Sequence, residues 1–241
     1  MIHDIAIADN IGEVRQRIER AARSCGRDPS RIDLLAVSKT KPASLLRQAH
    51  QLGLRAFGES YLQEAQVKIA DLADLPVEWH FIGRIQSKKC KTIATLFDWV
   101  QSVDRLSVAE KLNRHRIGAR PLNILIQVNP QGEPGKGGVA ISETRALVRQ
   151  IFDYPYLQIR GLMCIPGTDP QSRHHSFCAM RELYCQMQQE FQHVDTLSMG
   201  MSMDLVDAIT CGSTMVRIGT ALFGPRDGCS PAEAHDHGGP P

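Results

Sequence analysis

Apolar and polar residues follow two different spacings along this chain. An opening stretch carries apolar residues at the spacing of a helix, and Cys25-Gly26 ends it. The apolar positions of this predicted helix are Ile11, Val14, Ile18, Ala21 and Ala22. Residues 32–37 (IDLLAV) then form a nearly continuous apolar run, which is typical of a strand buried on both faces in a parallel sheet.

Strand-like and helix-like segments alternate from this point to the end of the pattern. The predicted strands cover residues 32–37, 55–58, 78–82, 99–103, 122–128, 157–165, 196–198 and 215–218. The predicted helices cover residues 42–53, 61–72, 105–115, 143–152, 176–191 and 204–211, with a basic helix from about residue 88.

Eight strand–helix units in a chain of 241 residues match an α/β fold, a single (β/α)8 TIM-type barrel with an extra N-terminal helix. A doubly wound open sheet is the alternative, but it usually has fewer strands and often a phosphate loop after the first. No G-x-G-x-x-G or Walker sequence occurs here. We expect the barrel domain to span residues 1–226 and the Pro- and Gly-rich residues 227–241 to be a disordered tail.

Composition fits one large domain of this kind. Hydrophobic residues make up 42% of the chain and charged residues 22%, which is enough apolar material for a sizeable core. The formal net charge is +2 and both signs are interspersed, which argues against a nucleic-acid or membrane-surface partner. No stretch reaches the roughly 20 apolar residues that span a bilayer, and the N-terminus lacks the pattern of a signal peptide.

Cysteine and histidine usage points to a reduced compartment and to no metal centre. The seven cysteines are odd in number and include no Cys-x-x-Cys, so we expect free thiols in a cytoplasmic protein. No histidine pair has the H-x-x-x-H or HExxH spacing of a metal site. His174-His175 and His235/His237 are therefore weak candidates for ligands.

Chemically capable residues follow the predicted strands at their carboxyl ends. They are Ser38-Lys39, Glu59-Ser60, Gly83, Arg84, Gln86, Asp104, Asn129, Pro166, Thr168, Gly200, Ser202, Gly219 and Thr220. Because barrel enzymes build their sites at this face, we expect these side chains to surround one site.

Lys39 is the most distinctive of these residues. It comes directly after a very apolar strand, so its stem begins in the barrel interior, where desolvation lowers the pKa of an ammonium group. A neutral amine attacks an aldehyde and forms a Schiff base. From position alone, a surface lysine reaching water is the more ordinary interpretation. Lys41, two residues further on, is expected to be exposed.

Two loops carry glycine together with a hydroxyl group. Gly200 and Ser202 precede a helix predicted to begin near Met203, and Gly219-Thr220 follow the last strand. Backbone N–H groups and hydroxyls bind phosphate in the corresponding loops of many barrels. Ordinary helix capping is the alternative for both loops.

Two polar residues lie within predicted strands. Arg217, between Val216 and Ile218, is expected to point inward, toward a phosphate, a cofactor ring nitrogen, or a carboxylate such as Glu59. His80 in WHFIG is also expected to face the interior, and a core histidine satisfied by hydrogen bonds is its simplest interpretation.

Several long motifs occur in a fixed order over residues 11–226. They are LLAVSKTKP, FGESYLQEA, WHFIGRIQSKK, GLMCIP, LSMGMSMDLVDAI and GSTMVRIGTALFGPR. Together they closely resemble the YggS/PROSC-type pyridoxal phosphate homeostasis proteins. The resemblance implies a barrel like the N-terminal domain of alanine racemase, without that enzyme's second domain.

The resemblance also implies a site for pyridoxal 5′-phosphate (PLP). It implies a Schiff base on Lys39, phosphate contacts from Ser202, Gly219 and Thr220, and Arg217 near the pyridine nitrogen. Met201, beside Ser202, and His80 complete the expected cofactor-binding residues. Two departures from the family pattern are Ser60 in FGESY, where FGENY is common, and Lys88 in SKK, where SNK is usual; Lys89 keeps the matching position.

Chemistry at the expected ring nitrogen favours a carrier over an enzyme. An arginine there disfavours ring protonation and weakens the cofactor as an electron sink. A racemase needs a second acid or base opposite Lys39, and only Tyr61 is close enough to consider. We therefore expect a monomeric, non-catalytic PLP carrier that supplies PLP-dependent apo-enzymes. A weak amino-acid racemase and a barrel that binds another phosphorylated metabolite non-covalently are the alternatives.

Overall fold

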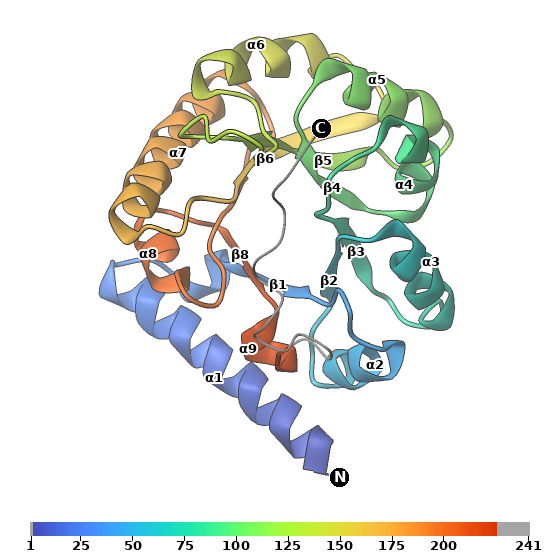
Figure 1. Ribbon diagram of the computed structural model, residues 1–241, viewed down its shortest axis with the longest axis vertical. Coiled ribbons are helices and arrows are strands. Elements are labelled where there is room, and N and C mark those ends of the chain that lie inside the picture. Colours follow the sequence, from blue (N-terminus) through green and yellow to red (C-terminus); the bar gives the residue numbers. More distant parts are fainter. Residues whose placement is uncertain (1, 226–241) are drawn as a thin grey trace, which may run out of the picture.

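Eight parallel strands close into a barrel in this protein, whose computed structural model describes residues 2–225, with side chains described from residue 7 onward. The strands follow one another around the barrel in chain order, and the last pairs with the first (Figure 1). They are β1 (Asp33–Val37), β2 (Ala56–Glu59), β3 (Glu78–Phe81), β4 (Trp99–Val103), β5 (Leu122–Val128), β6 (Leu157–Cys164), β7 (Thr196–Ser198) and β8 (Met215–Ile218). The predicted (β/α)8 barrel is confirmed, and the open sheet is wrong.

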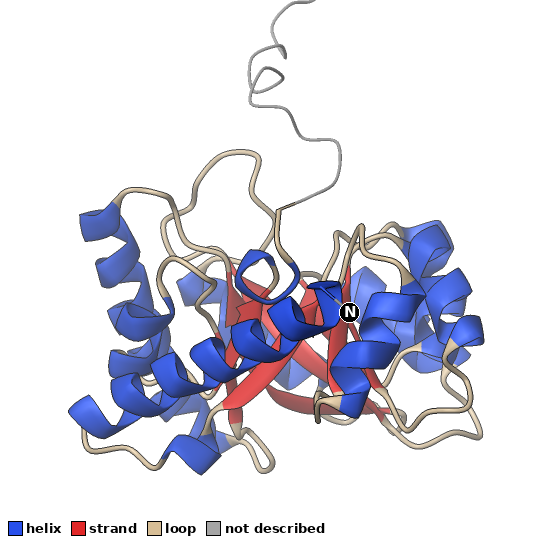
Figure 2. Cartoon of the chain, turned by 90° about the horizontal axis from the view of Figure 1, so that it is seen from below, coloured by secondary structure: helices blue, strands red, loops and turns tan. Residues whose placement is uncertain are grey.

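Helices surround the strands on the outside of the barrel (Figure 2). The α-helices are α1 (Ile2–Ser24), α2 (Ala43–Gln51), α3 (Leu62–Asp71), α4 (Cys90–Leu96), α5 (Leu106–His115), α6 (Ile141–Ile151), α7 (Pro170–Glu190), α8 (Leu205–Thr210) and α9 (Thr220–Phe223). Two 3-10 turns, η1 (Pro29–Arg31) and η2 (Ser87–Lys89), precede β1 and α4. No helix within residues 2–225 is long and apolar enough to cross a membrane. The expected tail over 227–241 lies outside the described residues.

The extra helix α1 is part of the core. Its predicted apolar positions, Ile11, Val14, Ile18, Ala21 and Ala22, are all at most 5% exposed. The helix packs against α8 and α9, the two helices that follow β7 and β8. It therefore supports the segments that carry the predicted phosphate loops.

Helix α7 begins six residues before its predicted start. Pro170 occupies the first turn, and the side chain of Asp169 accepts a hydrogen bond from Ser172 N at 2.8 Å. Proline and a capping aspartate are a strong start signal. The first turns of α7 are polar and present no apolar face, so hydrophobic periodicity alone did not predict them.

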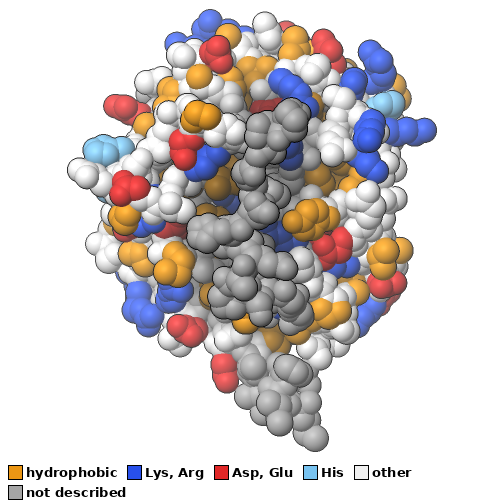
Figure 3. Space-filling model, viewed as in Figure 1, with side chains coloured by type: hydrophobic (Ala, Val, Ile, Leu, Met, Phe, Trp, Pro, Cys, Tyr) orange, Lys and Arg blue, Asp and Glu red, His pale blue; other side chains and the backbone are white. Residues whose placement is uncertain are grey.

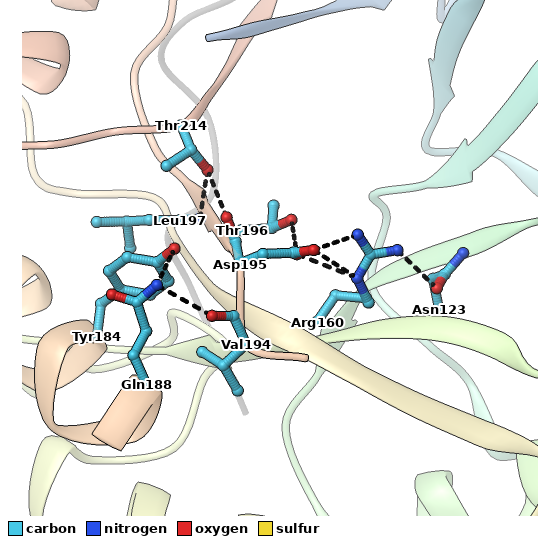
Figure 4. Close-up of polar contacts among 9 residues, drawn as sticks. All are labelled: Asn123, Arg160, Tyr184, Gln188, Val194, Asp195, Thr196, Leu197 and Thr214. Carbon is cyan, nitrogen blue, oxygen red and sulfur yellow. Dashed lines mark hydrogen bonds and ion pairs between the residues drawn. The ribbon is translucent and has the colours of Figure 1, made fainter. Parts of the chain in front are cut away.

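Polar side chains hold together the end of the barrel where the strands begin (Figure 4). Arg160 Nε donates to Asp195 Oδ1 at 3.0 Å, and its NH1 donates to Asn123 Oδ1 at 3.2 Å. The same guanidinium lies 4.8 Å from the centre of the Trp99 ring. This end of the barrel is thus built for stability, which leaves the opposite face for a site.

The face seen in Figure 1 carries basic and acidic side chains interspersed with hydrophobic ones (Figure 3). No single sign of charge dominates it among the residues that the structure describes. This pattern agrees with the small net charge of the sequence.

Candidate functional site

A cavity of about 320 Å³ opens at the carboxyl end of the barrel strands. Its volume lies in the range of small-molecule sites. It brings together six of the seven predicted site residues: Lys39, Met201, Ser202, Arg217, Gly219 and Thr220. The apolar part of its wall includes Val37 of β1, Ile82, the residue after β3, and Met163 of β6. Polar and apolar side chains therefore meet at the carboxyl ends of the strands.

Lys39 is half-buried in this cavity, two residues beyond the end of β1. The next residue, Thr40, has a φ of 67°, in the left-handed region that β-branched residues rarely adopt. Its backbone N–H donates to Glu64 Oε1 at 2.5 Å, which holds the turn in place. The chain thus bends sharply just after the lysine.

A buried ionic network supports the other side of this turn. Glu59 is fully buried, and it accepts hydrogen bonds from Ser38 Oγ at 2.6 Å and Lys68 Nζ at 2.8 Å. Lys68 also donates to Ser38 O at 2.7 Å and pairs with Glu64. Burial raises the pKa of Glu59, although the hydrogen bonds from Lys68 and Ser38 oppose the shift. Both backbone neighbours of Lys39 are therefore fixed through this network.

Lys41 differs from its prediction. It was expected to be exposed, but only 7% of it is exposed, and its Nζ donates to Pro225 O at 2.5 Å. The left-handed residue Thr40 turns the chain back over the barrel, and this buries the second lysine of the motif. A strand-end pattern contains no signal for such a turn at threonine.

The loops after β7 and β8 meet beside Lys39. Ala221 N donates to Ser202 Oγ at 3.4 Å, which links the two loops. Helix α8 begins at Leu205, after a turn, so Ser202 lies in the loop and does not cap the helix. A Cβ added at Gly219 would lie 3.2 Å from Val37 O, so this position accommodates a close approach of backbone. The hydroxyls of Ser202 and Thr220 and nearby backbone form a polar corner of the cavity.

Arg217 points into the barrel from β8 but does not pair with Glu59. Its NH1 donates to Ser198 O at 2.8 Å and Ser198 Oγ at 2.9 Å, and its NH2 donates to Cys164 O at 2.8 Å. Burial lowers the pKa of Arg217, and a guanidinium nevertheless stays charged. The alternative of an ion pair with Glu59 is not found among the described contacts of Arg217, because Lys68, on α3, pairs with that carboxylate.

His80 faces the barrel interior, as expected, but does not line the cavity. Gln101 Nε2 contacts His80 Nδ1 at 2.9 Å, and Ser198 Oγ donates to Gln101 Oε1 at 2.7 Å. Because Ser198 also binds Arg217, His80 is connected to the cavity through two intervening side chains. Its other nitrogen contacts Glu78 Oε1 at 2.8 Å.

Sequence reasoning missed two polar residues that organise this site, Gln101 and Lys68. Gln101 interrupts the apolar strand WVQSV, and a lone amide in such a run is a usable signal. Lys68 lies on a helix with one exposed and one buried face, and the sequence alone does not distinguish a buried lysine on such a helix from a surface lysine.

A second pocket of about 450 Å³ adjoins the cavity through Ser60. It is lined also by Tyr61, Arg84 and Lys89, while Tyr61 is 54% exposed. Tyr61 therefore belongs to the neighbouring pocket and not to the Lys39 cavity.

The donors of the cavity fit a phosphorylated carbonyl compound. Lys39 supplies an amine, the corner at Ser202, Gly219 and Thr220 supplies donors for an anion, and Arg217 supplies a fixed positive charge. The apolar wall suits an aromatic ring lying between them.

Comparisons with known proteins agree with this arrangement. Residues 3–227 match the family described as "Alanine racemase, N-terminal domain". A pyridoxal phosphate homeostasis protein of Pseudomonas aeruginosa is 52% identical, over 94% of this chain and 98% of its own. The protein of the same name from Escherichia coli (strain K12) is 46% identical, over 92% of this chain and 97% of its own. The structure of PipY from Synechococcus elongatus with PLP bound has 36% identity and a TM-score of 0.79, covering 90% of this chain and 100% of that one.

Proposed function

This chain belongs to the YggS/PROSC-type family of pyridoxal phosphate homeostasis proteins, and from that premise we propose that it binds PLP at Lys39 and acts in PLP homeostasis. The observation that carries the proposal is the single cavity in which Lys39 lies with Ser202, Arg217, Gly219 and Thr220. The amine binds an aldehyde, the anion corner binds a phosphate, and the cation of Arg217 lies where it can contact the ring between them.

Each residue has a proposed role. Lys39 holds the aldehyde carbon of PLP as a Schiff base, and Ser202, Gly219 and Thr220 hold the phosphate. Arg217 lies near the ring nitrogen, where it keeps that nitrogen unprotonated. Met201 contributes apolar contact, and His80 acts through Gln101 and Ser198 by orienting Arg217. The bound cofactor supplies an electrophilic aldehyde and an electron-withdrawing ring.

We propose that the protein is a carrier without robust catalysis of its own. The guanidinium of Arg217 is oriented by the carbonyl oxygens of Ser198 and Cys164, and no described hydrogen bond or ion pair joins it to a carboxylate. Asp204, which lines the same cavity, acts on it electrostatically. A permanent cation at the ring nitrogen weakens electron withdrawal by the ring. Among the described residues that line the cavity there is no tyrosine or histidine to act as a second acid or base opposite Lys39. The carboxylate there, Asp204, accepts a hydrogen bond from the backbone N–H of Met201.

A weak amino-acid racemase is the second candidate, favoured by the family match to the alanine racemase domain. It is tested by racemisation assays with several amino acids. The carrier proposal predicts no turnover that depends on Lys39, and enzyme-like rates abolished in Lys39→Ala would replace it.

The covalent bond is tested by visible absorption before and after borohydride reduction, followed by peptide mass mapping. We expect an absorption band that reduction removes, with the added mass on the peptide that contains Lys39. Lys39→Ala removes the fixed mass, while the exposed-lysine control Lys91→Ala retains it. Undiminished PLP affinity in Lys39→Ala would support instead a non-covalent site for a phosphorylated metabolite.

We further propose a monomer in the cytoplasm that passes PLP to apo-enzymes. The barrel covers its strands with its own helices, and this removes one reason to associate. Sedimentation of the purified protein tests the monomer. Transfer of PLP from the loaded protein to a PLP-free transaminase tests delivery, and transfer no faster than from free PLP contradicts it.

A further inference from the structure

Three metal-binding side chains meet on the outside of the barrel, where α7 passes α8. His174 and Cys178 are four residues apart on α7 and so share one face of that helix. Cys211 ends α8, at the end opposite to the cavity residue Asp204. This cluster, called here the thiol–imidazole cluster, consists of His174, Cys178 and Cys211.

The separations within the cluster are those of ligands around one metal ion. The two Sγ atoms lie 3.9 Å apart, and His174 Nε2 lies 3.6 Å from Cys178 Sγ. Zinc bonds of about 2.3 Å to sulfur and 2.0–2.1 Å to nitrogen give tetrahedral edges of about 3.8 Å between sulfurs and 3.5 Å between sulfur and nitrogen. All three ligand atoms lie within 4.8 Å of one another. Cys211 Sγ lies 3.8 Å from the other ring nitrogen, His174 Nδ1, so the exposed imidazole must rotate to bring a single nitrogen to an ion shared by both sulfurs.

We propose that the thiol–imidazole cluster binds one zinc ion, with a water molecule in the fourth position. Two thiolates and an imidazole are soft and borderline ligands, which select zinc over calcium or magnesium. Binding forms two S–Zn bonds and one N–Zn bond, and the two thiol protons pass to solvent. The site is independent of the proposed PLP function, because none of its residues lines the Lys39 cavity.

The surroundings leave this site accessible. His174 and Cys178 are exposed and Cys211 is half-buried. A surface pocket of about 830 Å³ borders the cluster and contains two further thiols, Cys25 and Cys185. A metal at the cluster joins α7 to α8, two neighbouring helices that are also linked by the ion pair of Arg173 with Asp207 at 3.7 Å.

Cobalt titration of the full-length, reduced, metal-free protein tests the proposal. Cobalt in a thiolate site gives an intense sulfur-to-metal absorption in the near ultraviolet, and zinc displaces it. We expect this band to saturate at one cobalt per chain. His235 and His237 give no such band when they bind cobalt, so the signal reports the cysteines alone.

Variants locate the ion. Cys178→Ser and Cys211→Ser are expected to lose the band, and His174→Ala to weaken cobalt binding by about 10–100-fold or more. Cys185→Ser, which changes a thiol of the same pocket, is the matched control and keeps the band. Circular dichroism verifies that each variant is folded. Absence of the band in the wild-type protein, or a band unchanged in Cys178→Ser and Cys211→Ser, overturns the proposal.

Discussion

Replacing Lys68 by methionine isolates the contribution of the ionic network that supports the Lys39 turn. The substitution keeps an unbranched side chain of similar length but removes the positive charge from Glu59, whose side chain is 0% exposed. Removing one partner of a buried ion pair costs about 3–5 kcal/mol of the free energy of unfolding.

The free energy needed to protonate Glu59 is an upper limit on this loss of stability. At about 1.36 kcal/mol per pKa unit, protonating a carboxyl with an unfolded pKa of about 4.3 costs about 3.7 kcal/mol at pH 7 and about 1 kcal/mol at pH 5. The folded variant therefore binds a proton that the unfolded chain releases, and its stability falls as the pH rises through this window. We expect Lys68→Met to lose about 3–4 kcal/mol at pH 7 and clearly less at pH 5.

Urea denaturation of the protein at both pH values measures the effect. The double variant Lys68→Met/Glu59→Gln is expected to recover much of the loss, since it leaves no buried charge. Arg47→Met, which breaks the exposed pair with Asp74, is the control and costs about 0–1 kcal/mol. Equal losses for Lys68→Met at pH 5 and pH 7, or no recovery in the double variant, would refute the reasoning.

Three further substitutions test separate parts of the structure. Ser202→Ala removes one hydroxyl from the proposed phosphate corner. Because a hydrogen bond to a charged group contributes about 1.5–3 kcal/mol, the variant is expected to bind PLP about 10-fold or more weakly. Equilibrium titration measures the PLP affinity, and an unchanged affinity contradicts the role of Ser202. Gly200→Ala is expected to lower the free energy of unfolding by about 1–3 kcal/mol in urea denaturation. The backbone φ of Gly200 is 98°, and the new Cβ would lie 2.6 Å from the Cβ of Ala208. An unchanged free energy of unfolding would show that the loop relaxes freely. Asp169→Ala removes the cap of α7 and is expected to cost about 1 kcal/mol in the same assay; no change would mean that solvent replaces the cap.

Strand order and several cavity residues (Lys39, Ser60, Ser202, Gly219 and Thr220) followed from sequence because they depend on local patterns, whereas Gly83, Arg84 and Gln86 line the neighbouring pocket instead. Apolar runs marked the strands, and the residues directly after them necessarily met at one end of a closed barrel. Lys41 and the partner of Glu59 did not follow, because each depends on a turn or helix whose orientation no period of the sequence encodes. Thr40 adopts a conformation unusual for threonine, and Lys68 is buried only because α3 places it over Ser38.

The thiol–imidazole cluster illustrates the same limit. His174 and Cys178 share a helix, but Cys211 lies 33 residues after Cys178 on another element. Metal-site patterns in sequence rely on fixed short spacings, and a site assembled across two helices has none.

The side chains that connect Arg217 to Glu78 form a series of hydrogen bonds whose donors all point the same way. A guanidinium can only donate and an ionised carboxylate can only accept, so the two ends orient every hydrogen between them the same way. Burial alone would raise the pKa of Glu78, but the interactions with His80, together with those of Trp99 and Arg160, outweigh burial and lower the pKa of this carboxyl. Glu78 is half-exposed at the opposite mouth of the barrel. The hydrogen bonds between the two openings of the barrel are consequently aligned head to tail, from the Arg217 cation beside the cavity to the Glu78 carboxylate at the opposite end.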